Sequence, residues 1–334
     1  MNGSILRGLV RVCVVAALAS LGFSNAFAED WAPLWSTANL SQARSDISAT
    51  SAGGKVLFGG NPQNSSSVVD IYDSSAGTWS VANLSQARSG ISVTSAGGKI
   101  LFGGGYNSSN TPSNVVDIYD SSAGTWSVAN LSQARSNISA TSAGGKVFFG
   151  GGHSSGTFSS VVDIYDTSTN SWSTTNLSQA RSSIPATSAG GKVFFGGGIY
   201  SFSGGYNHNS SVVDIYDTSS GSWSVANLSQ ARSDISVTSA GGKILFGGGY
   251  NSSNTFLNVV DIYDSSAGTW SVANLSQTGP GISVTSAGGK VCGGPGALDS
   301  FWVKLRCVVF TETSGPRHPL RCRAAAKPPV RLVC

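Results

Sequence analysis

Five arginines recur at the end of one phrase, Asn-Leu-Ser-Gln-Ala-Arg, along most of the 334-residue chain. Several guanidinium groups around one centre would bind carboxylate or phosphate groups, because each is a fork of hydrogen-bond donors that matches those anions. The arginines are Arg44, Arg88, Arg135, Arg181 and Arg232. Each repeat also carries an aspartate that could pair with its arginine, at Asp70, Asp117, Asp163, Asp214 and Asp261. The sequence favours this internal pairing over an anion site and leaves both open.

The residue two places after each arginine varies from repeat to repeat. In chain order it is Asp46, Gly90, Asn137, Ser183, Asp234 and, after the sixth phrase, Gly281. A position that varies while its surroundings stay constant is a candidate for binding a particular ligand, because loops on a rigid scaffold carry function. We therefore take Asp46, Asn137 and Asp234 as candidate ligand-binding residues.

Aromatic side chains stand in the loops of the repeats, where they could stack on sugar rings or on the side chains of a partner. The longest of these loops, residues 199–211, contributes Tyr200, Tyr206 and His208 as further candidates for ligand binding. The other loop aromatics are Tyr106, Phe158, Phe202, Tyr250 and Phe256. Single exposed aromatics also occur without a function, so this signal is weak by itself.

A repeat of near-constant length positions all of these residues. Equivalent tryptophans follow one another at steps of 44, 47, 46, 51 and 47 residues, from Trp35 to Trp270, and such a period indicates a repeat architecture. In the second repeat we predict strands at 91–96, 99–102, 115–119 and 125–129, where β-branched and aromatic residues gather. Gly97-Gly98 predicts a type I′ turn between the first two, because glycine accepts positive φ at both central positions.

The glycines that end the second strand, the Val-Asp-Ile-Tyr-Asp of the third and the Trp of the fourth resemble the kelch repeat. The resemblance covers residues 35–291 and implies a β-propeller of four-stranded blades, each burying both faces against its neighbours. The five full repeats are 44–82, 88–129, 135–175, 181–226 and 232–273. We therefore expect an all-β, six-bladed kelch-type β-propeller, whose last blade (281–291) is closed by the N-terminal strand 35–38. The loops after the second and fourth strands should share one face.

The two ends of the chain differ from the repeats. Residues 1–28 have the pattern of a secretory signal peptide, in which Arg7 and Arg11 precede a short apolar core. We expect cleavage after Ala28; the alternative is an uncleaved anchor. Residues 29–291 form the propeller, and 292–334 form a basic tail with all four cysteines of the mature chain. This tail either completes the sixth blade, through a segment such as 301–310, or is foreign sequence from a shifted reading frame. Three disulfide pairings are open.

Composition excludes some classes of function. Charged residues make up 11% of the chain, and the net charge of +4 comes from the tail, so nothing favours nucleic-acid binding. No further segment is long and apolar enough to span a membrane. The Asn-x-Ser sequons, such as Asn83 and Asn130, are either glycan acceptors or turn chemistry copied with the repeat.

Catalysis finds little support in the residues. Galactose-oxidase-like enzymes, which share the propeller, need a copper site of Tyr, His and a cross-linked Cys, but the repeats hold no Cys and only His153 and His208. Sialic acid mutarotases need a Glu beside an Arg, and the mature chain has only Glu29 and Glu312, both outside the repeats. We expect no cofactor, no metal, and an exported monomeric scaffold that binds a protein or a glycan on one face. A mutarotase-type sugar enzyme is the alternative; a near-inert repeat expansion is a third reading.

Overall fold

The computed structural model describes residues 37–45, 47–60, 66–201, 207–276, 278, 283–287, 290–294 and 306–309. The expected signal peptide, Trp35, Asp46, Phe202, Tyr206, Gly281 and most of the tail lie outside these residues. Export, the closing N-terminal strand and the choice between the two accounts of the tail therefore stay predictions.

Antiparallel sheets, each running in chain order, make up the described fold. The first sheet contains β1 (Ser48–Ala52), β2 (Lys55–Gly59), β3 (Ser66–Asp73) and β4 (Thr78–Ser89), and the second contains β5 (Ser92–Ala96), β6 (Lys99–Gly103), β8 (Val115–Asp120) and β9 (Thr125–Asn130). The third is formed by β10 (Ser139–Ala143), β11 (Lys146–Gly150), β14 (Val161–Asp166) and β15 (Ser171–Asn176). We call these sheets blades 1, 2 and 3.

Blade 4 contains β16 (Ala186–Ala189), β17 (Lys192–Gly196), β19 (Asn207–Asp217) and β20 (Ser222–Arg232), and blade 5 contains β21 (Ser236–Ala240), β22 (Lys243–Gly247), β23 (Val259–Asp264) and β24 (Thr269–Asn274). Within the described residues the sixth sheet has three strands, β25 (Ser283–Ala287), β26 (Lys290–Gly294) and β27 (Arg306–Val309). Strand β27 falls inside the segment 301–310, which one of the two accounts of the tail assigns to a third strand of the sixth blade. The prediction of an all-β fold is confirmed.

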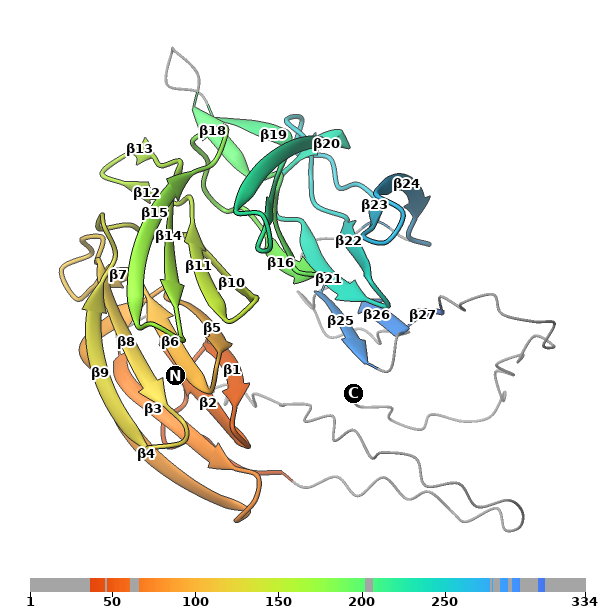
Figure 1. The fold of residues 1–334 in the computed structure, drawn as a ribbon. Coiled ribbons are helices and arrows are strands. Elements are labelled where there is room, and N and C mark those ends of the chain that lie inside the picture. Colours follow the sequence, from red (N-terminus) through yellow and green to blue (C-terminus); the bar gives the residue numbers. More distant parts are fainter. Residues whose placement is uncertain are drawn as a thin grey trace, which may run out of the picture.

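The sheets follow one another along an arc, with β1, β5, β10, β21 and β25 on its inner side and β4, β9 and β24 on its outer side (Figure 1). Short additional strands extend the loops. They are β7 (Tyr106–Asn107), β12 (His153–Ser154) with β13 (Thr157–Phe158), and β18 (Ile199–Ser201), which pairs with the start of β19. The loops after the second and fourth strands of every blade lie on one face of the array, which we call the loop face. The short turns after the first and third strands lie on the opposite face, which we call the turn face.

Glycines make both the turns and the packing between blades possible. Gly97 and Gly98 have φ of 54° and 76°, as the predicted type I′ turn requires. Gly150 ends β11 at an ordinary φ, but a Cβ there would lie 2.5 Å from a ring carbon of Phe195 in the next blade. The pairs Gly59–Phe102, Gly103–Phe149 and Gly196–Phe246 repeat this contact. Glycine thus leaves room for the phenylalanine of the following blade.

Each core lies between two neighbouring blades. Side chains of blade 1 pack against side chains of blade 2, namely Leu57, Val69 and Ile71 against Ile100, Phe102 and Tyr119. Equivalent clusters lie between blades 2 and 3, blades 3 and 4, and blades 4 and 5. Serines of the first strands add hydrogen bonds across the same boundaries, as Ser48 Oγ donates to the Ile91 carbonyl at 2.8 Å. Since every blade is completed by its neighbour, the array is the smallest stable unit.

Candidate functional site

The recurring arginines lie inside the blades. Arg88 is fully buried; its Nη1 donates to the carbonyls of Gly104 and Val115, both at 2.7 Å, and its Nη2 donates to Asp117 Oδ2 at 2.5 Å. The other carboxylate oxygen of Asp117 accepts the backbone N–H of Ser85 at 2.7 Å. The connection between blades 1 and 2 is thereby fixed to the third strand of blade 2. The same ion pair recurs as Arg44–Asp70, Arg135–Asp163, Arg181–Asp214 and Arg232–Asp261.

This geometry does not fit the anion-binding interpretation of Arg44, Arg88, Arg135, Arg181 and Arg232. Each guanidinium is buried, and its terminal nitrogens already donate to a carboxylate and to main-chain carbonyls. Burial lowers the pKa of Arg88, and the neighbouring Asp117 opposes that shift. The arginines therefore act as ties within the fold, and a ligand on the surface would not reach them.

The variable position after each arginine has a backbone explanation that sequence reasoning missed. Asn137, Ser183 and Asp234 have φ between 49° and 51°, and Gly90 has 57°. This left-handed conformation is tolerated best by Gly, Asn and Asp, which accounts for Gly90, Asn137 and Asp234 but not for Ser183. Asn137 and Asp234 are exposed on the loop face, so they remain candidates for contact with a ligand.

Side chains of blades 2 and 3 meet on the loop face around a histidine. Tyr106 Oη and His153 Nε2 are hydrogen bonded at 2.9 Å, across the boundary between the blades. The ring of Phe158 lies 6.3 Å from the His153 ring and nearly perpendicular to it. Tyr106 and Phe158 were among the predicted loop aromatics, but His153 was not among the candidates. Its place directly after the third glycine of the strand end, which Tyr106 and Tyr250 share in their repeats, was the available signal.

Blade 4 extends the loop face further than its neighbours. Strands β18 and β19 form a hairpin in which Tyr200 is paired with His208, with ring centroids 5.7 Å apart. Asn209 Nδ2 donates to the carbonyl of Tyr250 in blade 5 at 2.8 Å, which anchors the base of the hairpin. Figure 1 shows β18 beside β19 at the top of the arc. Of the candidates in this loop, the structure thus brings Tyr200 and His208 together.

The hollow at the inner side of the arc offers little chemistry. It measures about 310 Å³ and is lined by first strands of blades 1 to 4, through residues such as Ser48, Ser92 and Ser139. These three hydroxyls donate to main-chain carbonyls of the next blade. None of the described residues that line this hollow is acidic or basic. None of the five buried Arg–Asp pairs contributes a residue to its described lining.

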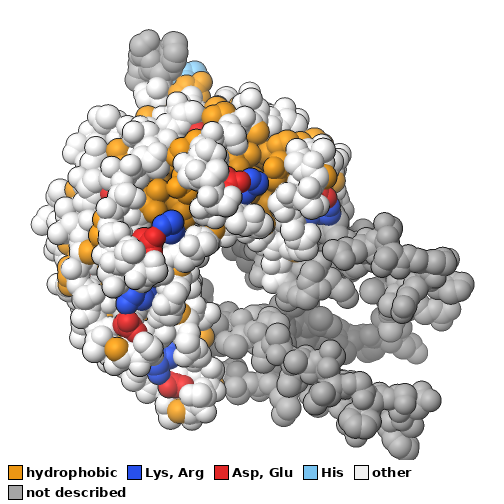
Figure 2. Space-filling model, viewed as in Figure 1, with side chains coloured by type: hydrophobic (Ala, Val, Ile, Leu, Met, Phe, Trp, Pro, Cys, Tyr) orange, Lys and Arg blue, Asp and Glu red, His pale blue; other side chains and the backbone are white. Residues whose placement is uncertain are grey.

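The turn face carries an ion pair in each of the first five blades. Lys99 Nζ donates to Asp120 Oδ2 at 2.8 Å, and equivalent pairs join Lys55–Asp73, Lys146–Asp166, Lys192–Asp217 and Lys243–Asp264. Figure 2 shows adjacent blue and red side chains repeating along the arc. The hydrogen bond from Lys99, followed by that from the Ser122 hydroxyl, holds the pKa of Asp120 well below its usual range. This face is regular and charge-balanced, unlike the varied loop face.

These low carboxylate pKa values predict a loss of stability in acid. A carboxylate whose pKa is lower in the folded than in the unfolded chain stabilises the fold above its unfolded pKa of about 3.9, and this contribution is lost as the pH falls. We expect the thermal unfolding midpoint to decrease as the pH is lowered below about 4. Replacing Asp73, Asp120, Asp166, Asp217 and Asp264 together by Asn should flatten that fall, as calorimetry across pH 2 to 7 would show. An equal fall in both proteins would contradict the prediction.

Within the described residues, no group of three or more His, Cys, Asp or Glu side chains has the arrangement of a metal site. No described helix is long and apolar enough to cross a membrane.

Successive four-stranded antiparallel sheets that pack face to face along an arc define a β-propeller. The family model for the KLHDC2/KLHL20/DRC7 Kelch-repeats domain matches residues 46–230, and the Kelch motif matches residues 231–274. Since the first match covers more than half of the chain, the protein belongs to the kelch-repeat family. Kelch repeats are typical of protein-interaction scaffolds. No curated protein matches the chain.

Proposed function

We propose that this chain is an exported binding scaffold that holds a partner protein on its loop face, with the β18–β19 hairpin of blade 4 as the main contact. The observation that carries the proposal is the difference between the two faces. The turn face repeats one ion pair from blade to blade, whereas the loops after the second strand differ in length and sequence among most blades; those of blades 2 and 5 are alike, and that of blade 4 is the longest. Selective recognition needs such variety on a rigid support.

The hairpin is suited to a protein contact because it combines reach with a fixed base. Tyr200 and His208 form a cross-strand aromatic pair, and Asn209 ties the hairpin to blade 5. Amphipathic rings such as tyrosine supply large contact areas at a low cost in conformational entropy. A protein partner could therefore engage the hairpin without a large rearrangement of the propeller.

The sugar-enzyme alternative lacks a comparable observation. The hollow on the inner side of the arc is lined by uncharged described residues, namely serines, alanines and aliphatic side chains, and the Arg–Asp pairs are closed within the blades. A proton-transfer enzyme needs an acid or base within hydrogen-bond reach of its substrate. A non-catalytic role is therefore part of the proposal.

Replacing residues 200–208 by a short Gly-Ser turn should abolish binding of the partner and leave the fold intact, because the described residues of this segment contribute to none of the cores between the blades. The measurement is a quantitative comparison of the extracellular proteins captured by the purified chain and by the variant. The matched control replaces residues 107–111, the tip of the equivalent loop of blade 2, and should retain the partner. The mature chain should begin at Glu29 if it is exported as proposed.

The proposal fails if the same proteins are captured with and without the hairpin, while circular dichroism shows both chains folded. Loss of capture in the blade 2 variant alone would place the contact on a different part of the loop face.

A further inference from the structure

A second hollow lies on the loop face in blade 3, apart from the blade 4 hairpin. It measures about 270 Å³, close to the lower end of the range for small-molecule sites, which begins near 300 Å³. It lies beside the β12–β13 pair and reaches the connections that precede and follow blade 3. The side chains that give it its character are Gln133, Ser154, Thr157, Phe158, Ser159 and Ser160.

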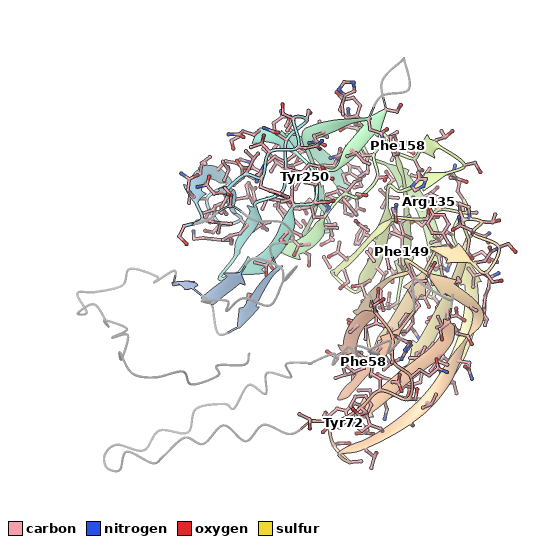
Figure 3. The ribbon with its side chains drawn as sticks, turned by 180° about the vertical axis from the view of Figure 1, so that it is seen from behind. Phe58, Tyr72, Arg135, Phe149, Phe158 and Tyr250 are labelled. Atoms are coloured by element: carbon pink, nitrogen blue, oxygen red, sulfur yellow. The ribbon has the colours of Figure 1, made fainter. Side chains whose placement is uncertain are left out.

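An aromatic ring of fixed orientation forms one side of this hollow. Phe158 lies in β13 and is paired with His153 in β12. Its ring is held against the imidazole of His153, which in turn is hydrogen bonded to Tyr106 of blade 2. Phe158 is half-buried, and Figure 3 places it toward the loops, away from the interior Phe149. The ring is therefore a supported apolar plate at the surface.

Neutral hydrogen-bonding groups form the remainder of the lining. The carbonyl oxygen of Gln133 accepts the Ser159 hydroxyl at 3.3 Å, which leaves the amide NH₂ without a partner among the described residues. Ser154 is half-buried and Thr157 is exposed, and each hydroxyl can both donate and accept. No lining side chain carries a charge. The hollow thus offers several neutral donors and acceptors beside one aromatic plate.

We propose that this hollow is a binding site for a neutral sugar residue, such as the end of an uncharged glycan. A pyranose ring presents an apolar C–H face that stacks on an aromatic ring, and its hydroxyls donate and accept hydrogen bonds at its edge. Phe158 supplies the ring, while Gln133 and the hydroxyls supply the complementary polar groups. The absence of a cation from the described lining disfavours an acidic sugar.

The other blades provide internal comparisons. Bridges between Tyr106 and Pro112 and between Tyr250 and Phe256 correspond to the pairing of His153 with Phe158. Blade 2 therefore has a proline where the ring stands. Blade 5 has the aromatic ring and Gln230, but Leu257 and Asn258 replace the two serines, and Asn258 donates to the Leu275 carbonyl. Among these three blades, blade 3 alone has the full set of groups.

The test is a ligand-observed saturation-transfer NMR titration of the purified full chain with glucose, galactose, mannose, xylose and N-acetylglucosamine at millimolar concentrations. Glucuronate and sialic acid are the charged probes. We expect at least one neutral sugar to bind. F158A should weaken its binding about tenfold, as loss of an aromatic contact does, and Q133A should weaken it about fivefold, as loss of one hydrogen bond does. The matched variant F256A in blade 5 should bind like the unaltered chain.

The proposal is overturned if no neutral sugar binds, if only the acidic sugars bind, or if F158A and Q133A both bind as tightly as the unaltered chain. Q133A alone decides the matter if F158A fails to fold, because Gln133 is exposed and makes no core contact. The lining of this hollow contains no residue of the segment 200–208, so the variant without that segment should still bind the sugar.

Discussion

Replacing Arg135 by alanine is expected to lower the free energy of unfolding by about 3–5 kcal/mol, because removal of one partner leaves the other charge buried and unpaired. Asp163 is 2% exposed, and besides Arg135 it accepts the backbone N–H of Ser132 at 2.8 Å. The carbonyl of Gly151 would also lose the arginine as a donor, and the carbonyl of Val161 would keep only the N–H of Gly151. Urea unfolding followed by tryptophan fluorescence measures the change.

Two controls separate this buried pair from ordinary surface charge. K146A, in the partly hydrated ion pair of the turn face in the same blade, should lower the urea midpoint far less than R135A does, because the carboxylate left behind stays accessible to water. Replacing both buried partners, as in R135M with D163L, should cost less than R135A alone, since no charge is then left unpaired. A loss for R135A no larger than that for K146A would show that the arginine is not a tie between blades.

A single methyl group at Gly150 is expected to cost about 1–3 kcal/mol of stability, because it overfills a closely packed boundary between blades. The added Cβ of G150A would lie 2.5 Å and 2.8 Å from two ring carbons of Phe195, which is fully buried. Neither the phenylalanine nor the strand beneath it can move without disturbing the core between blades 3 and 4. The loss is measured as the shift of the urea midpoint.

Blade 5 supplies the matched control for this substitution. Gly247 has the equivalent place in β22, but among the described residues a Cβ there would meet only a methyl carbon of Val260, at 3.8 Å. G247A should therefore change the free energy of unfolding by less than about 1 kcal/mol. If both variants lose the same stability, the cost lies in the strand backbone and the phenylalanine is not its cause.

Most of the strand pattern could be predicted, because it is written in local residue types. The predicted strands of the second repeat agree with β5, β6, β8 and β9 to within one residue at each end. Glycine pairs, β-branched runs and a recurring Trp act locally, and each repeat supplies the same signal again. The number of blades is not encoded in such local signals, because closing the ring depends on contacts between distant ends of the chain.

The candidate site was harder to predict because its geometry depends on neighbouring blades. Pairing of the arginines with the aspartates could be anticipated from charge, but the main-chain carbonyls that accept from the terminal guanidinium nitrogens have no signature in the sequence. The left-handed backbone at Asn137 and Asp234 was readable from the residue types, yet it was attributed to ligand specificity. The contact of Tyr106 with His153 joins residues 47 positions apart and follows only from the packing of blades 2 and 3.

The recurring contact between a strand-end glycine and the phenylalanine of the next blade has a consequence for the order in which the array opens. Gly293 stands where each of the other blades has a phenylalanine, and the connection that leads to the sixth sheet lacks the recurring arginine. In a linear array of coupled units, local opening begins at the weakest junction. Amide hydrogens of the sixth sheet should therefore exchange with solvent before those of blades 2 to 4, and proteases should trim the array from this end. The almost identical blades are thus unequal in kinetic stability.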